Sequence, residues 1–207
     1  MIRLGVLVSG SGTNLQALLN AIEAKTLDAQ IAVVVSNRAD AYGLERAKSA
    51  KIPAVTVDHK AFATREAFDA AVVDVLRAHR VEWVVLAGFM RIVTPTLLGA
   101  FPNKVVNIHP ALLPSFPGAH AHRDALAYGV RISGCTVHLV DAGTDTGPIL
   151  AQAVIPVTDD DDEASLAKKT LLVEHQLLPR VLQWAAQGKI QIEPAQPGHR
   201  PKVRIKL

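Results

Sequence analysis

The sequence has one cysteine, little excess charge and no long apolar run, and each shortage argues against a class of protein. The single cysteine, Cys135, cannot form an intrachain disulfide, which is compatible with a reducing cytosol. Its strand-like surroundings favour a small buried side chain. The net charge of +3 suits an anionic small molecule but does not indicate a nucleic-acid-binding protein. No apolar run has the length of a membrane span, and the N-terminus lacks the layout of a secretion signal. We therefore expect a cytoplasmic protein with neither nucleic-acid nor membrane partners.

The sequence does have the composition of a globular domain. Hydrophobic residues make up 49% and charged residues 20% of the 207 residues, which is enough to bury a substantial core. There is no internal repeat and no linker, so we expect one domain over residues 1–207. The end of the chain, 199–206, alternates basic and apolar residues and is expected to form a peripheral strand.

The spacing of the apolar residues predicts an α/β fold. Strand-like and helical segments alternate up to Tyr128, which is typical of a doubly wound, Rossmann-like, mostly parallel sheet. Beyond Tyr128, two strand-like segments, 133–140 and 148–156, predict an antiparallel portion. The acidic run 159–163 begins a helix that ends near Ala186. We interpret this run as a helix N-terminus rather than a metal site.

A glycine-rich loop follows the first predicted strand, Ile2 to Val8. The loop, Ser9 to Asn14, leads into a helix, and this layout directs backbone N–H groups and a helix N-terminus at one place, which suits a phosphate. It is not a Walker loop. It is also a poor dinucleotide fingerprint, because Leu15 takes the place of the third glycine and the next strand, 31–36, ends without a ribose-binding acid. The alternative is a tight turn that needs glycine.

The stretch Val105 to Pro110 carries the most distinctive polar residues. It begins as a buried strand and presents Asn107 and His109, which share one face because they are two residues apart. Asp145 lies in a glycine- and threonine-rich loop further along the chain. An amide, an imidazole and a carboxylate at the end of a parallel sheet indicate acyl transfer. The alternative is a histidine and an asparagine satisfied in the core, with Asp145 as a turn residue.

Two further features leave both readings open. Arg65 falls in the first turn of a helix, 64–79, where the helix dipole disfavours a cation. It either holds a carboxylate or is an ordinary surface arginine. The loop 88–93 is apolar where loops are usually polar, so it either lines a pocket for a flat ring or belongs to the core.

Four motifs in this order resemble one family: Ser9 to Leu15, Leu86 to Ile92, Asn107 to Pro114, and Asp145 to Pro148. The chain resembles the phosphoribosylglycinamide formyltransferases, folate-dependent enzymes of purine synthesis, over residues 1 to about 190. The Asn-x-His-Pro segment with the later aspartate is specific for the wider formyltransferase superfamily. The glycine loop and the compact length point to this branch.

The resemblance implies that the chain transfers the formyl group of 10-formyltetrahydrofolate to 5′-phosphoribosylglycinamide without a metal. The implied catalytic residues are Asn107, His109 and Asp145. The implied ribonucleotide contacts are Gly12, Thr13, Asn14, Leu171, Leu172, Val173 and Glu174. The implied folate contacts are Arg65, Met90, Arg91, Ile92, Val93, Asn107, Asp141, Ala142, Gly143, Thr144 and Asp145.

On this reading, residues 1–100 form the nucleotide-phosphate half, 101–190 the catalytic and folate half, and 191–207 a peripheral tail. We expect the oligomeric state to be a monomer or a homodimer. The resemblance also implies a cis Leu113–Pro114 bond. The loop from Ala111 to about His122 is expected to be a mobile cover over the active site.

Other functions compete with this one. Within the superfamily these are a methionyl-tRNA formyltransferase and a formyltetrahydrofolate hydrolase, which usually carry a further domain for which we expect no room here. Outside it, a metal-dependent hydrolase would use His109, His120, His122 and Asp145, since the His-x-His spacing is compatible with metal ligation. A non-catalytic nucleotide-binding module would leave the Asn107, His109 and Asp145 set unexplained.

Overall fold

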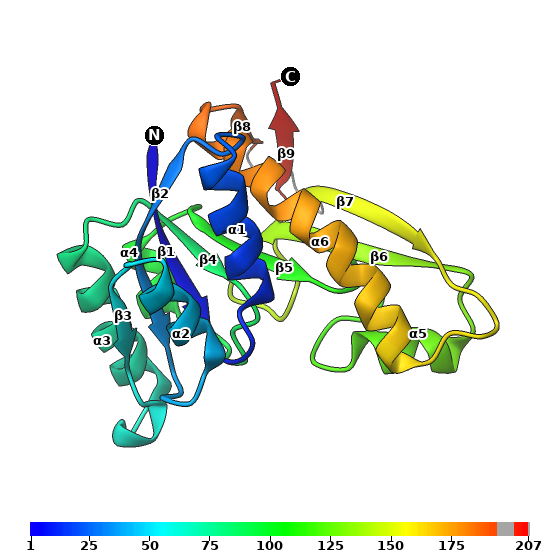
Figure 1. Ribbon diagram of the computed structural model, residues 1–207, viewed down its shortest axis with the longest axis horizontal. Helices are drawn as coiled ribbons and strands as arrows, with labels where there is room; N and C mark the ends of the chain where they lie inside the picture. The colour runs from blue at the N-terminus through cyan, green and yellow to red at the C-terminus, as the bar shows by residue number, and fades with distance from the viewer. Residues whose placement is uncertain (194–200, 207) are drawn as a thin grey trace. The chain divides into compact units, whose positions relative to one another are not determined.

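Strands and helices alternate through the first half of the chain, as the apolar spacing predicts. A computed structural model describes residues 1–193 and 201–206, and these residues group into two compact units, Met1–Asn107 and Ile108–Leu207. The first unit contains, in chain order, β1 (Ile2–Val8), α1 (Thr13–Glu23), β2 (Ala29–Ser36), α2 (Tyr42–Ser49), β3 (Ala54–Thr56), the 3₁₀ helix η1 (His59–Ala61), α3 (Arg65–Ala78), β4 (Trp83–Leu86), α4 (Pro95–Ala100) and most of β5 (Val105–His109) (Figure 1).

The strands of the first unit lie in the order β3-β2-β1-β4-β5, and every neighbouring pair is parallel (Figure 1). The chain adds β2 and β3 on one side of β1, and then β4 and β5 on the other. In sheets of this kind, ligands bind outside the carboxyl ends of the strands at the point where the order reverses. Here that point lies between β1 and β4. The segments that follow these two strands are the glycine loop and the 88–93 loop.

The second unit carries the antiparallel portion. It contains α5 (Ala121–Tyr128), β6 (Ile132–Leu139), β7 (Ile149–Pro156), α6 (Glu163–Ala186), β8 (Ile190–Glu193) and β9 (Lys202–Ile205). β6 pairs antiparallel with β7, and β8 pairs antiparallel with β9. Side chains of α5, β7 and α6 share a small core that includes Ala125, Ile155 and Leu166. The predicted mostly parallel sheet with a later antiparallel portion is thus confirmed.

The differences from the predicted elements are small. β2 begins at Ala29 rather than at Ile31, because the strand pairs with β1 from its first residue. The first unit ends at Asn107, where the pairing of β5 with β4 also ends, and the predicted functional division at residue 100 stays a prediction. Of the predicted tail strand 199–206, residues 202–205 form β9, and residues 199 and 200 lie outside the described residues. That residues 1–207 are one domain stays a prediction.

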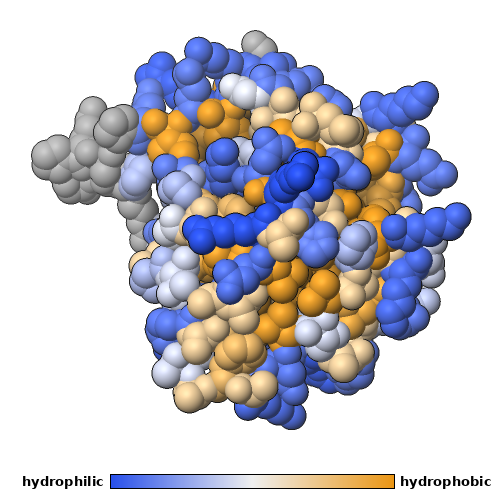
Figure 2. All heavy atoms as spheres, turned by 90° about the vertical axis from the view of Figure 1, so that its left-hand side faces the viewer, coloured by the Kyte–Doolittle hydropathy of each residue, from blue (hydrophilic) through white to orange (hydrophobic). Residues whose placement is uncertain are grey.

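Not all apolar side chains are buried. In the space-filling view, apolar residues come to the surface in the middle of one face, between polar ones (Figure 2). Exposed apolar residues are normal in small numbers. No helix in the described part of the chain combines the length and the apolar character that crossing a bilayer requires.

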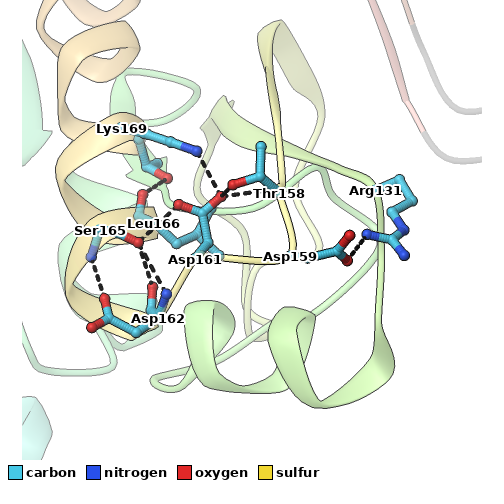
Figure 3. A network of polar contacts seen from close by, with 9 residues as sticks. Arg131, Thr158, Asp159, Asp161, Asp162, Ser165, Leu166 and Lys169 are labelled. Carbon is cyan, nitrogen blue, oxygen red and sulfur yellow. Dashed lines mark hydrogen bonds and ion pairs between the residues drawn. The ribbon is translucent and has the colours of Figure 1, made fainter.

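The acidic run 159–163 starts α6, as predicted. Asp162 caps the helix through a reciprocal pair of hydrogen bonds with Ser165. The neighbouring carboxylate of Asp161 is only 4% exposed and accepts hydrogen bonds from the Thr158 backbone N–H at 2.8 Å, the Ser165 hydroxyl at 2.8 Å and the Lys169 ammonium at 2.6 Å (Figure 3). The run therefore fixes where α6 begins.

Replacing Asp161 by asparagine is expected to lower the melting temperature at pH 7. Hydrogen bonding from Lys169, then from Thr158 and Ser165, holds the pKa of the Asp161 carboxyl well below its usual value. A carboxyl with a depressed folded-state pKa stabilises the fold above its unfolded pKa, and this stabilisation is lost as the pH falls below about 4. Thermal unfolding measured from pH 7 to pH 3 should therefore show that the difference in melting temperature between the parent protein and Asp161→Asn becomes smaller towards low pH.

Asp160→Asn is the matched control for this prediction. It removes the same charge one residue away, at an exposed side chain. An equal loss of melting temperature in the two variants, or a gap that does not change with pH, would show that net charge rather than the hydrogen bonds of Asp161 explains the effect.

Candidate active site

The glycine loop presents an open helix N-terminus. Gly12 precedes α1 with φ of 68°, a left-handed conformation, and no side chain caps the first turn, which also lacks acidic residues. A Cβ on Gly12 would come within 2.7 Å of the Gly43 Cα. The N–H groups of the first turn and the helix dipole both favour an anion here. Gly12, Thr13 and Asn14 thus form a candidate phosphate site, although the glycine itself is also required by the local backbone.

The 88–93 loop is tied to the end of β1. The Ser9 N–H donates to the Gly88 carbonyl at 3.1 Å, and the Met90 N–H donates to the Ser9 hydroxyl oxygen at 2.8 Å. The Ser9 hydroxyl in turn donates to Asn37 Oδ1 at 2.6 Å. Three parallel strands, β1, β2 and β4, are therefore joined at their carboxyl ends through one hydroxyl group.

The predicted folate contacts of this unit divide into exposed and buried side chains. Met90 and Ile92 are 74% and 56% exposed, whereas Val93 is 6% exposed and belongs to the core. Val93 is therefore a core residue, and the pocket-lining role of Met90 and Ile92 stays a prediction. The Arg91 guanidinium lies over the Phe68 ring at 5.5 Å. Arg65 is the exposed first residue of α3, directly after the cap Thr64.

β5 delivers Asn107 and His109, and a second loop brings Asp145 to His109. The His109 side chain is 4% exposed, and its Nδ1 lies 3.3 Å from Asp145 Oδ2. The other ring nitrogen, Nε2, is 2.8 Å from the Phe116 carbonyl oxygen, and the Gly118 N–H donates to Asp145 Oδ2 at 2.8 Å. Asn107 is half-buried on the same face of the strand. The His109 imidazole and the Asp145 carboxylate thus lie next to each other, as the sequence predicts.

Burial and charge act in opposite directions on this pair. Burial lowers the pKa of His109 below its ordinary value, while the Asp145 charge and the hydrogen bond to Phe116 act to raise it. Burial alone would raise the pKa of Asp145, but the nearby His138 and His109 imidazoles and the hydrogen bond from the Gly118 N–H hold that pKa below its ordinary value. The resting pair is therefore a carboxylate beside a neutral imidazole, which is ready to accept a proton.

His138, which the motifs did not predict as a site residue, also lies at Asp145. Its side chain is 2% exposed, its Nε2 lies 3.6 Å from Asp145 Oδ1, and its Nδ1 lies 2.9 Å from the Leu139 carbonyl oxygen. The signal was present in the sequence, because Thr136 and His138 are polar residues at alternate positions of an otherwise apolar strand, and therefore point to one face.

Thr136 organises the loop that follows His109. Its hydroxyl donates to the Ala111 carbonyl at 2.7 Å and accepts from the Leu113 N–H and the Gln152 amide, each at 3.0 Å. The Leu113–Pro114 peptide bond is cis, as the resemblance implies. The loop is held at this end by β6 and β7. Its mobility as a cover stays a prediction.

Side chains of the 141–145 loop shape the loop itself. Asp141 Oδ1 accepts from the Gly143 N–H at 3.1 Å and from the Thr146 hydroxyl at 2.6 Å. Asp145 has φ of 54°, a left-handed conformation that aspartate and asparagine tolerate better than other residues. Any folate contact of residues 142–144 is therefore presented from a defined turn.

Residues Leu171 to Glu174 occupy successive positions of α6 and so point in different directions. Leu172 is 62% exposed, Val173 packs against the small core of the second unit, and Glu174 is only 5% exposed.

Burial, with the Glu174 charge, raises the pKa of the Cys135 thiol to about 12, so this cysteine is a neutral buried side chain, as predicted. Among the described residues, no group of three or more histidine, cysteine, aspartate or glutamate side chains is placed to hold a metal ion.

Comparison with known proteins identifies the family of this chain. A family described as formyl transferase matches residues 2–182. The phosphoribosylglycinamide formyltransferase of Escherichia coli is 40% identical over 90% of this chain and 88% of its own length. The crystal structure of glycinamide ribonucleotide transformylase 1 from Symbiobacterium toebii is 49% identical, with a TM-score of 0.94 over 99% of this chain and 94% of that one.

Longer relatives contain a similar region. The trifunctional purine biosynthetic protein adenosine-3 of Homo sapiens is 43% identical over 92% of this chain, and the matched region makes up 19% of that protein. In the protein of the same name from Drosophila melanogaster, the matched region makes up 14% of the length. The match over nearly the whole of this chain, together with the pairing of His109 and Asp145, leads to one conclusion. The chain belongs to the formyl transferase family.

Proposed function

We propose that this chain transfers the formyl group of 10-formyltetrahydrofolate to the amine of 5′-phosphoribosylglycinamide, a step of purine synthesis, in the cytoplasm. The observation that carries the proposal is the buried His109–Asp145 pair, with Asn107 two residues before His109 on β5. The two small molecules are the only partners required. Neither a nucleic acid, a membrane nor a metal takes part, and the enzyme acts as a monomer or a homodimer.

The proposed chemistry follows from the groups on β5 and the 141–145 loop. The substrate amine attacks the formyl carbon, and an oxyanion develops on the formyl oxygen. The Asn107 amide donates an N–H to that oxygen. The His109 Nε2–H is engaged by the Phe116 carbonyl, so Nδ1, next to Asp145, is the nitrogen left to accept the amine proton. When the tetrahedral intermediate collapses, the bond between the formyl carbon and the folate nitrogen breaks, and this proton passes to that nitrogen, so that tetrahydrofolate leaves.

The remaining predicted residues would bind the two substrates. Gly12, Thr13 and Asn14 would hold the phosphate through N–H groups of the open helix start, with residues 171–174 of α6 on the nucleotide side. Arg65, residues 90–93 and the 141–145 loop would meet the folate. Val93 acts through packing, because it is buried in the core.

The purified full chain should form formylglycinamide ribonucleotide from these two substrates. Parallel reactions with charged initiator tRNA, and with water as the only acceptor, separate this activity from methionyl-tRNA formyltransferase and formyltetrahydrofolate hydrolase. Faster transfer to tRNA, or release of formate at the same rate without the ribonucleotide, would overturn the proposal.

His109→Ala and Asp145→Asn are expected to lower kcat by similar factors, and the double variant by far less than the product of the two. Groups that handle one proton act as a unit, so removing the second partner removes little that is left. Steady-state kinetics of the four proteins measure this. Factors that multiply in the double variant would mean that the two side chains work independently.

A further inference from the structure

His138 approaches Asp145 from the side opposite to His109. Asp145 Oδ2 accepts from the Gly118 N–H and faces His109 Nδ1 at 3.3 Å, whereas Oδ1 faces His138 Nε2 at 3.6 Å. His138 is 2% exposed on β6, and nothing in the proposed chemistry so far uses it. The carboxylate is thus held between two buried imidazoles that come from different strands.

Backbone carbonyls determine where both imidazoles carry a proton. A carbonyl oxygen only accepts hydrogen bonds, so His109 Nε2, at 2.8 Å from the Phe116 oxygen, and His138 Nδ1, at 2.9 Å from the Leu139 oxygen, each carry hydrogen. The nitrogens that face Asp145 are therefore bare in neutral rings. Two bare nitrogens and a carboxylate repel one another in a buried place, and a proton bound between them removes the repulsion.

We propose that His138 is a positioning residue for the formyl transfer, because its Nε2 faces Asp145 Oδ1 at 3.6 Å and holds this carboxylate in its orientation towards His109. The inference rests on the proposed function. With Asp145 held in this orientation as an anion beside a neutral His109, Nδ1 of His109 is available for the amine proton. The protonated His109 that results is then stabilised by the same carboxylate.

Few ionisable groups act on this cluster. Within the described residues, the ionisable groups that shift the pKa of Asp145 are His109 and His138, and those that shift the pKa of His109 are Asp145 and His138. His109, and Glu163 on α6, in turn act on the pKa of His122, which lies on α5. From α6, the buried Glu174 acts on Cys135, a neighbour of His138 on β6. A change in the pH profile on removal of His138 would therefore report on the pair of Asp145 and His109.

Replacing His138 by phenylalanine keeps a ring of similar size but removes both nitrogens. We expect kcat to fall by about 10–100-fold, less than the ~10²–10⁴-fold expected for loss of the base itself. KM for both substrates should stay within about twofold. The His138 imidazole lowers the pKa of Asp145, so its removal should move the acidic limb of the kcat/KM profile to higher pH. His138→Gln offers an amide N–H at this place and should recover most of kcat.

His79→Phe is the matched control. His79 also donates from Nδ1 to a backbone carbonyl, that of Val75 at 2.9 Å, but it lies at the end of α3 and has no catalytic part. It should leave kcat and the pH profile unchanged. If His138→Phe lowers only the melting temperature, or lowers kcat without moving the acidic limb while His138→Gln shows no recovery, His138 is a structural residue and the inference is wrong.

A second measurement does not need activity. Long-range ¹H–¹⁵N spectra of protein labelled with ¹⁵N-histidine report which ring nitrogens carry hydrogen. Asp145→Asn should shift the ring signals of both His109 and His138, which are assigned by the single variants. Unmoved His138 signals would overturn the inference. If wild-type protein transfers no formyl group, the proposed function fails while this spectroscopic test still decides on the contact between His138 and Asp145.

Discussion

Replacing Asp145 by asparagine is expected to lower kcat by about 10²–10⁴-fold, the range for loss of a general acid–base group. Asparagine has the same size and tolerates the left-handed backbone that Asp145 adopts, with φ of 54°. The Gly118 N–H also keeps an acceptor, because the amide oxygen can replace Oδ2. What disappears is the negative charge that stabilises a proton on His109 Nδ1, so the loss should fall on kcat rather than on KM.

Steady-state kinetics with both substrates, and thermal unfolding of the same samples, measure this prediction. Asp124→Asn on α5 is a suitable control, since it removes an exposed carboxylate of the second unit whose partner is Arg123. A variant at Asp145 that retains half of the parent kcat would return this residue to the status of a turn former and show that its charge is not needed to stabilise the proton on His109.

Replacing Gly12 by alanine is expected to raise KM for the ribonucleotide by about 10–100-fold, with a smaller effect on KM for the folate. An L-residue in the left-handed conformation loses roughly 1–2 kcal/mol, and the new Cβ would lie 2.7 Å from the Gly43 Cα, so the loop must move. A moved loop weakens the hydrogen bonds from backbone N–H groups to the phosphate, which are worth roughly 1.5–3 kcal/mol each. The melting temperature should fall as well.

Two other glycines separate the effect of a steric clash from the effect of the left-handed backbone. Gly10 lies in the same loop, has no left-handed φ, and has no atom within 4 Å of an added Cβ, so Gly10→Ala should change little. Gly88 has φ of 71° but open space, so Gly88→Ala shows the conformational penalty without a clash. If Gly12→Ala lost stability only, with an unchanged KM for the ribonucleotide, the loop would be a structural turn and phosphate would bind elsewhere.

The sequence was informative wherever a pattern repeats along the chain. The strand–loop–helix start, the parallel strands and the face shared by Asn107 and His109 all follow from periods of two and 3.6 residues. The acidic run before α6 was predicted as a helix start, and the structure confirms it. Element ends shifted by one or two residues, since pairing with the neighbouring strand decides where a strand begins.

The parts that the sequence did not predict depend on contacts between distant segments. The Phe116 carbonyl and the Gly118 N–H are backbone groups, which exist at every position and are marked by no residue type. His138 lies seven positions before Asp145, with nothing in the spacing to show that they meet. The roles of Gly12 to Asn14, Arg65 and residues 90–93 in binding substrates stay predictions.

The buried state of Cys135 makes this chain convenient for chemical labelling. The thiol is 0% exposed, and its pKa of about 12 leaves almost no thiolate at neutral pH, which is the form that reacts with maleimides and oxidants. A cysteine introduced at an exposed position such as Met90 would be the only reactive thiol of the protein. A fluorophore or spin label attached there would report on the 88–93 loop during turnover, without any prior substitution of the native cysteine.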